Sequence, residues 1–230
     1  QIGQFSSLET SIYHTFLKGN YGFDFNNFIG LSSTDELYNY AFQSNLVGFF
    51  SNYTLSKKQF NLISGVHGNI YNRQHTGSEK TIGQLYQNTG YKNEISVFTK
   101  VDYSLKWFAF FADVQYRYVN FDYKGSVALQ KLDWHFINPK AGLSATLNNN
   151  YILYYSVGYT GREPTRNDMF SGNDDLLADS LGNAILSNAN PEFVLNHELG
   201  FRFQKEKMNF NANLYYMDFQ NEIVLDGKFG

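Results

Sequence analysis

The amino-acid sequence predicts an all-β fold, a segment of an antiparallel transmembrane β-barrel with roughly eight to ten strands. Three features predict this fold: apolar and polar residues alternate over long runs, the apolar face is aromatic, and tight turns alternate with long polar loops. The 230 residues include 22 Phe and 18 Tyr. Large aromatic residues that alternate with Ser, Asn, Gln and Thr suit a sheet with lipid on one face and water on the other.

The clearest alternation lies in the C-terminal half of the chain. Apolar residues recur at every second position over residues 137–147, 151–160 and 193–204, with polar residues between them. This period of two indicates a strand with one apolar face. Residues 95–118 repeat the pattern on both sides of a turn, although Phe98 must point to the polar side. Runs of about ten or more residues are long enough to cross a hydrocarbon layer.

The alternation also predicts which side chains face water inside the barrel and which face lipid. Charged side chains fall on one face. The expected lumenal set is Asp113, Arg117, Arg162, Arg166, Asp168, Glu198 and Arg202. The expected lipid-facing set is Val114, Tyr116, Leu143, Tyr155 and Leu214. Within the lumen, we expect Arg162 to pair with an inward carboxylate such as Glu198.

Turns and loops alternate along the chain. Tight turns are predicted near residues 57, 106, 149 and 206, and long polar loops near residues 82, 126 and 178. Short turns on one rim and long loops on the other are typical of outer-membrane barrels. A soluble antiparallel sandwich is the alternative fold, but its strands are typically about five to six residues long and its loops alternate less regularly.

The first half of the chain gives a weaker signal. Residues 45–55 and 60–71 are expected to form strands, because their apolar residues alternate. Residues 72–93 are mostly polar and are expected to form a long loop, and residues 120–133 a second long connection. Residues 1–31 alternate too weakly to be assigned.

The longest predicted loop runs from about residue 163 to residue 192 and is expected on the extracellular rim. Its polar residues include a candidate ligand-binding group, Ser171, Asn173, Asp174 and Asp175. A mobile loop that only covers the rim is the alternative. A Ca²⁺ site built from Asp168, Asp174, Asp175 and Asp179 is less favoured than a solvated acidic loop, because the spacing of a known calcium loop is missing.

Several classes of function are excluded by composition and spacing. The chain has no Cys, no apolar run of about 18 residues and a net charge of −3, so we expect no thiolate site, no transmembrane helix and no nucleic-acid partner. The cluster of Arg162, Glu163, Arg166 and Asp168 lacks a nucleophile with a neighbouring base, so an enzyme is not expected. The histidines lack metal-ligand spacing, and neither a metal nor a cofactor is predicted.

A series of short motifs resembles the C-terminal part of the barrel of a TonB-dependent outer-membrane receptor of the Bacteroidetes type. The motifs lie at residues 112–117, 138–143, 154–156, 162–168, 190–192, 198–200 and 213–224. The resemblance implies an outer-membrane location and energised uptake of a scarce ligand, such as an iron-siderophore, haem or cobalamin, with a metal chelate first and a glycan second. It also implies two further partners, membrane lipid and an energising protein of the TonB type that contacts a plug.

The chain departs from that family in its extent. A plugged barrel of this kind has about 22 strands. No plug, signal peptide or terminal strand is visible, since the chain ends at residues 226–230. We therefore expect residues 1–230 to be a single barrel segment. A complete eight-stranded barrel with an adhesin or structural role is the alternative, because barrels also close at about eight strands.

Overall fold

The computed structural model describes residues 3–32 and 37–224, and residues 226–230, where a terminal strand was sought, lie outside this part. Within it, nine antiparallel strands form one sheet in sequence order. The strands are β1 (Ser6–Phe23), β2 (Tyr38–Lys57), β3 (Phe60–Glu79), β4 (Gly83–Ser104), β5 (Phe108–Lys124), β6 (Leu132–Asn148), β7 (Tyr151–Arg162), β8 (Glu192–Lys205) and β9 (Met208–Gln220). Two short helices, α1 (Phe25–Phe28) and α2 (Arg166–Met169), follow β1 and β7.

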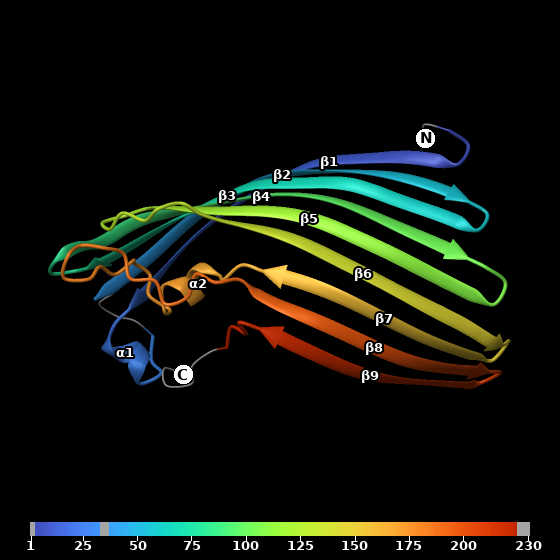
Figure 1. Cartoon of the computed structure of the whole chain (residues 1–230). Helices are drawn as coiled ribbons and strands as arrows, with labels where there is room; N and C mark the ends of the chain where they lie inside the picture. Colours follow the sequence, from blue (N-terminus) through green and yellow to red (C-terminus); the bar gives the residue numbers. More distant parts are fainter. Residues whose placement is uncertain (1–2, 33–36, 225–230) are drawn as a thin grey trace.

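The sheet is an open, curved wall with α2 on its concave side (Figure 1). The prediction of an all-β antiparallel fold is confirmed. The strands β1 and β9 lie at the two edges of the sheet and do not pair with each other, so the expectation of a complete small barrel is wrong. No helix in the described ranges has the length and apolar character needed to cross a membrane.

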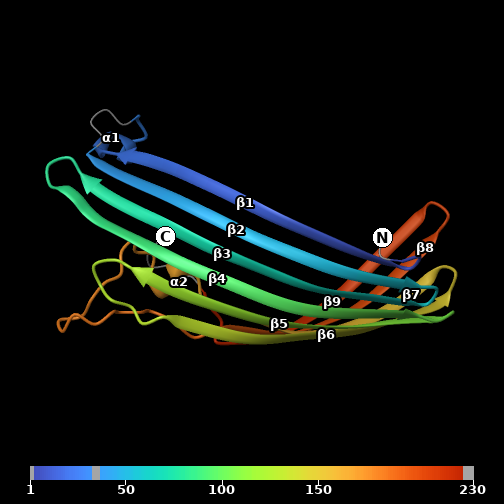
Figure 2. The ribbon, with the colours of Figure 1, turned by 90° about the horizontal axis from the view of Figure 1, so that it is seen from above.

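The connections are sorted between the two ends of the strands, which run side by side in Figure 2. One end, which we call the turn end, carries the tight turns at residues 58–59, 105–107, 149–150 and 206–207. The other, the loop end, carries the connections at residues 24–37, 80–82, 125–131 and 163–191. All four predicted tight turns are confirmed, and so is the position of the longest loop.

One loop prediction was wrong, one predicted connection is shorter than expected, and one unassigned segment forms a strand. Residues 72–93 form no long loop, because β3 and β4 continue to pair as far as Glu79 and Gly83 and leave a three-residue connection, residues 80–82. The strand β5 likewise extends to Lys124, which shortens the predicted connection 120–133. The unassigned N-terminal segment holds β1. The outer parts of β3 and β4 carry mostly polar residues on both faces, which hides the period of two.

One face of the sheet carries a continuous apolar row. Its members are direct cross-strand neighbours from β3 to β9: Phe60, Tyr103, Phe110, Leu143, Tyr155, Leu199 and Leu214. Val114 and Tyr116 share this face with Phe110, since side chains alternate along β5. The five residues predicted to face lipid are between 44% and 69% exposed. An exposed apolar face of this extent marks contact with a membrane or a partner.

The opposite, concave face carries the strand residues of the predicted lumenal set, Asp113, Arg117, Arg162, Glu198 and Arg202. Asp113 lies between Lys100 and Lys140 in the register, and Arg117 reaches Glu163 in the connection that follows β7. Phe98 also lies on this face, where Gly65 leaves room for its ring, since a Cβ at Gly65 would come within 2.7 Å of that ring. The charged and apolar sets therefore lie on opposite faces of the sheet.

Candidate functional site

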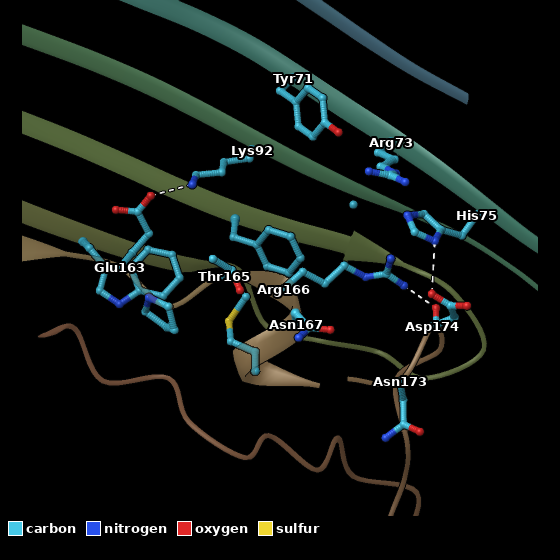
Figure 3. A pocket seen from close by; sticks show the side chains of 15 residues that line it. Tyr71, Arg73, His75, Lys92, Glu163, Thr165, Arg166, Asn167, Asn173 and Asp174 are labelled. Carbon is cyan, nitrogen blue, oxygen red and sulfur yellow. Dashed lines mark hydrogen bonds and ion pairs between the residues drawn. The ribbon is translucent and has the colours of Figure 1, made fainter. Parts of the chain in front are cut away.

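A cavity of about 340 Å³ lies at the loop end, on the concave face. Its wall on one side consists of β3, β4 and the ends of β5 and β6, and its cover is the first part of the connection 163–191, which we call the long loop. Figure 3 shows that the labelled side chains of Arg73, His75 and Lys92 come from the sheet and those of Arg166 and Asp174 from the long loop.

Apolar packing attaches the long loop to the sheet. Met169, Phe170 and Leu176 are buried against an aromatic cluster that the sheet supplies. The sheet side of this cluster consists of Val119, Phe121, Tyr123, Trp134 and Phe136. The ring of Phe170 meets Phe121 and Tyr123 edge-on, with centroids 6.3 and 5.2 Å apart. Burying each of these large apolar side chains stabilises the docked loop by about 1.5–3 kcal/mol, so the first part of the long loop is packed against the sheet.

A buried ionic network fixes the start of the long loop. Arg117 donates to both oxygens of Glu163 at 2.7 and 2.8 Å and to Glu94 at 2.9 Å. Lys92 lies 2.5 Å from Glu163, whose side chain is only 5% exposed. Burial raises the pKa of the Glu163 carboxyl, but the hydrogen bonds from Arg117 and Lys92 outweigh burial and leave that pKa below its ordinary value. Glu163 is therefore ionised at neutral pH.

Two carboxylates of the long loop bind the sheet directly. The Asp175 carboxylate accepts hydrogen bonds from Asn88, Tyr123 and Ser126. Asp174 accepts from Tyr86 at 3.0 Å, and its backbone carbonyl accepts from Asn88 at 2.8 Å. Burial and the hydrogen bond to Asp175 raise the pKa of Tyr123 to about 12, so its hydroxyl remains a donor. Asp175, predicted to bind ligand, thus serves to dock the loop.

The cations of the cavity are unevenly compensated. His75 lies 3.5 Å from Asp174, yet burial, followed by the charges of Arg166 and Arg73, lowers its pKa to about 4. His75 is therefore neutral at pH 7. Arg166 donates to Asn88 at 3.0 Å and to the backbone carbonyl of Asp174. Arg73 stacks on Phe42, with 4.3 Å between its guanidinium carbon and the ring centroid.

Of the residues predicted as ligand-binding or lumenal, three line the cavity: Arg166, Asn173 and Asp174. Arg117 lies beside the cavity and acts through Glu163. Ser171 is in the left-handed region, with φ of 52°, and helps the chain turn after α2. Asn173 donates to the carbonyl of Phe170 and stabilises the same turn.

The remaining predicted residues lie elsewhere. Arg162 pairs with Glu192 at 2.7 Å, not with Glu198, which accepts instead from Tyr154 and Asn213. Asp168 caps α2 by accepting from the Thr165 backbone and hydroxyl, so it is a local structural residue. Arg202 donates to Asn211 near the turn end.

The acidic residues considered for Ca²⁺ make separate contacts. Asp168 caps α2, Asp174 and Asp175 bind the sheet, and Asp179 accepts from Asn183 within its own turn. In residues 3–32 and 37–224, no group of three or more His, Asp or Glu side chains is arranged to hold a metal ion.

Sequence reasoning missed the residues that β3 and β4 contribute to the cavity: Tyr71, Arg73, His75, Gly90 and Lys92. All lie in or next to residues 72–93, which were predicted to form a loop. Tyr71, Arg73 and His75 alternate at every second position, so a strand assignment would have placed them on one face. The register then sets Gly90 and Lys92 directly opposite Arg73 and Tyr71.

An aromatic, lipid-compatible outer face, a charged concave face and a loop-covered cavity define a wall segment of an outer-membrane barrel. The chain belongs to the TonB-dependent receptor-like β-barrel family, whose model matches residues 3–230. This finding confirms the TonB-dependent receptor family and the outer-membrane location, while the Bacteroidetes type stays a prediction. The family consists of receptors and transporters rather than enzymes. No match is found among curated protein sequences.

Solved structures show the same fold at low sequence identity. The copper transporter OprC superposes with a TM-score of 0.75 at 12% identity, over 94% of this chain and 36% of that chain. The unliganded ferric citrate transporter FecA superposes with a TM-score of 0.64 at 11% identity, over 98% of this chain and 35% of that chain. The closed form of the ferric-catecholate import receptor Fiu from K12 E. coli superposes with a TM-score of 0.63 at 10% identity, over 99% of this chain and 40% of that chain. The chain thus spans less than half the length of these relatives.

Proposed function

We propose that this chain is part of the wall of a TonB-dependent outer-membrane receptor that takes up a scarce ligand, with a metal chelate as the first candidate. The concave face would line the lumen, the apolar row would face lipid, and the loop end would face the outside. The observation that carries the proposal is the cavity of about 340 Å³ beneath the docked long loop, within the size range of about 300–1,000 Å³ for small-molecule sites.

The charge of the cavity supports a chelate that carries negative groups. Arg73, Lys92 and Arg166 line it together with Glu163 and Asp174. Glu163 is already engaged by Arg117 and Lys92, so the acidic residues do not balance the arginines. The likenesses to copper, ferric citrate and ferric-catecholate transporters agree with this class of ligand but concern the fold alone.

A glycan is the second candidate, because aromatic side chains also line the cavity. Tyr71, Phe121 and Trp134 present ring surface to it, and aromatic rings combined with a few polar groups suit sugar recognition as well. As for any member of this family, an energising protein of the TonB type is the expected partner.

The proposal is tested by uptake in cells. The full-length protein is expressed in a strain that lacks its own ferric-chelate receptors, and uptake of radioactive ferric citrate, a ferric tris-catecholate and a labelled oligosaccharide is measured with and without the energising protein. We expect uptake of a ferric chelate only when the energising protein is present. Uptake of the oligosaccharide alone would favour the glycan, and no energised uptake of any probe would contradict a transport function.

A further inference from the structure

Two arginines of the cavity carry a donor that no group in residues 3–32 and 37–224 satisfies. The Nε atoms of Arg73 and Arg166 are buried and have no hydrogen-bond partner. Arg73 forms no hydrogen bond or ion pair with any residue that the structure describes, and its guanidinium lies over the ring of Phe42. Arg166 donates only to neutral oxygens, those of Asn88 and the Asp174 backbone. A buried donor without an acceptor is costly and rare in native proteins.

The two guanidinium groups also repel each other across the cavity. Burial lowers the pKa of Arg166 and the charge of Arg73 lowers it further, while Tyr123, Asp174 and Tyr86 oppose these effects. Two carboxylates line the cavity: Glu163 is bound by Arg117 and Lys92, and Asp174 contacts Tyr86 and His75. Two guanidinium groups therefore line the same cavity, and neither forms an ion pair with a carboxylate of the described residues.

An anion placed between the two arginines would accept hydrogen bonds from the unpaired Nε donors and would also offset the like charge of the two guanidinium groups. Arginine presents a planar fork of N–H donors that matches carboxylate and phosphate oxygens, and such charge-assisted bonds are about twice as strong as neutral ones. Figure 3 shows Arg73 projecting from the sheet and Arg166 from the long loop toward the same part of the cavity, next to His75. An anion there would bridge the sheet to the loop.

We propose that Arg73 and Arg166 form an oxyanion subsite that recognises a carboxylate or phosphate group of the ligand. The subsite deepens the proposed uptake function and rests on it for the identity of the ligand. Tyr71 lines the same cavity and faces it in Figure 3, where its hydroxyl is available as a further donor. A neutral ligand can accept from these donors but forms no charge-assisted bond with them, so it is expected to bind more weakly than an anion.

The test is isothermal titration calorimetry of the full-length protein in detergent, with citrate as the carboxylate probe, inorganic phosphate as the phosphate probe and neutral maltotriose as the control. The variants are Arg73→Gln, Arg166→Gln and Arg73→Lys. Arg202→Gln is the matched control, because Arg202 is an arginine of the same concave face near the turn end. Hydrogen bonds to charged groups are worth enough that each Gln variant should bind at least about tenfold more weakly.

We expect citrate or phosphate to bind at one site, whichever source of the oxyanion fits better, and Arg202→Gln to leave that binding unchanged. Arg73→Lys keeps the charge but loses the fork, so it should recover only part of the affinity. Absence of binding by both probes, or equal weakening by Arg202→Gln, would overturn the subsite.

A stability measurement separates ligand recognition from a structural role. Removing an uncompensated cation should leave the melting temperature of the free protein unchanged or higher in Arg73→Gln, whereas a fall of several degrees would show that Arg73 has a structural partner and would overturn the proposal. Calorimetry needs no energising protein, so it tests the subsite independently of transport. Anion binding without uptake would contradict the transport function but not the subsite. Uptake that is unchanged in both Gln variants would contradict the subsite but not the transport function.

Discussion

Replacing Glu163 by Gln should loosen the long loop without unfolding the sheet. Glu163 accepts two hydrogen bonds from Arg117, at 2.7 and 2.8 Å, and an ion pair from Lys92 at 2.5 Å. Gln keeps one acceptor oxygen, and Arg117 keeps Glu94 at 2.9 Å, so only part of this network is lost. We expect the free energy of docking the long loop to fall by about 2–3 kcal/mol, which is comparable to one hydrogen bond between charged groups.

That loss corresponds to an increase of about 30- to 140-fold in the population with an undocked loop, since about 1.4 kcal/mol is a factor of ten. Hydrogen–deuterium exchange of the full-length protein in detergent measures it. The backbone N–H of Leu176 donates to the Tyr123 hydroxyl at 3.2 Å, so its exchange rate reports docking directly. It should rise by the same factor, provided that exchange proceeds through loop opening.

Asp179→Asn is the matched control, because Asp179 is also an acidic residue of the long loop but accepts only from residues 181 and 183 of its own turn. It should leave the exchange of Leu176 unchanged. If Glu163→Gln raises this exchange less than threefold, or if Asp179→Asn raises it equally, the ionic network does not hold the loop and the reasoning fails.

Three further predictions concern the loop and the open sheet. Phe170→Ala removes a ring that is 3% exposed and should weaken docking by about 3 kcal/mol, seen as faster proteolysis at residues 177–188; unchanged proteolysis would contradict the packing account. The pKa of His75 is about 4 when the long loop is docked, compared with an ordinary value of 6.5, so protonation of His75 opposes docking. Docking is therefore most stable above about pH 6.5 and weakens as the pH falls toward 4, where the population with an undocked loop should be up to roughly a hundredfold larger. Exchange of Leu176 should rise over this range in the native protein, and His75→Gln should flatten the profile. The isolated chain should associate in detergent when analysed by light scattering, because β1 and β9 expose unpaired edges, and a cooperative monomer would contradict this.

The strands that cross the membrane were the most predictable part of the fold. Along β5 to β9, apolar and polar residues alternate because one face meets lipid and the other does not. The tight turns were equally clear, since they interrupt this alternation. The sequence therefore sufficed for the fold class, the turn end and the position of the longest loop.

The outer parts of the strands were not predictable from alternation. In β3 and β4, residues 72–79 and 83–93 are polar on both faces, so the pattern of a loop and that of a solvated strand coincide. What keeps them extended is the continued pairing of the two strands, for example between Arg73 and Gly90. Such pairing is a property of two distant segments and leaves no local signal.

The candidate site was only partly predictable for the same reason. The long loop was identified by its length and polarity, but Asp175 was assigned to ligand rather than to Asn88 and Tyr123, which lie 87 and 52 residues earlier in the chain. Arg73 and Lys92 were assigned to a loop and not to a site. The partners of a docked loop follow from the register of the sheet, which only the structure supplies.

The central claim is that the concave face lines an aqueous lumen and the apolar row faces lipid. Single cysteines are introduced at Glu198, Leu199, Phe201 and Arg202 of the full-length protein and labelled with a nitroxide. The 230 residues hold no Cys, and any Cys elsewhere in the full-length protein is first replaced by Ser. Collision with oxygen and with a water-soluble nickel complex is then measured in lipid vesicles. The account predicts oxygen accessibility at Leu199 and Phe201 and nickel accessibility at Glu198 and Arg202. Uniform accessibility along β8, or the reverse alternation, would contradict it.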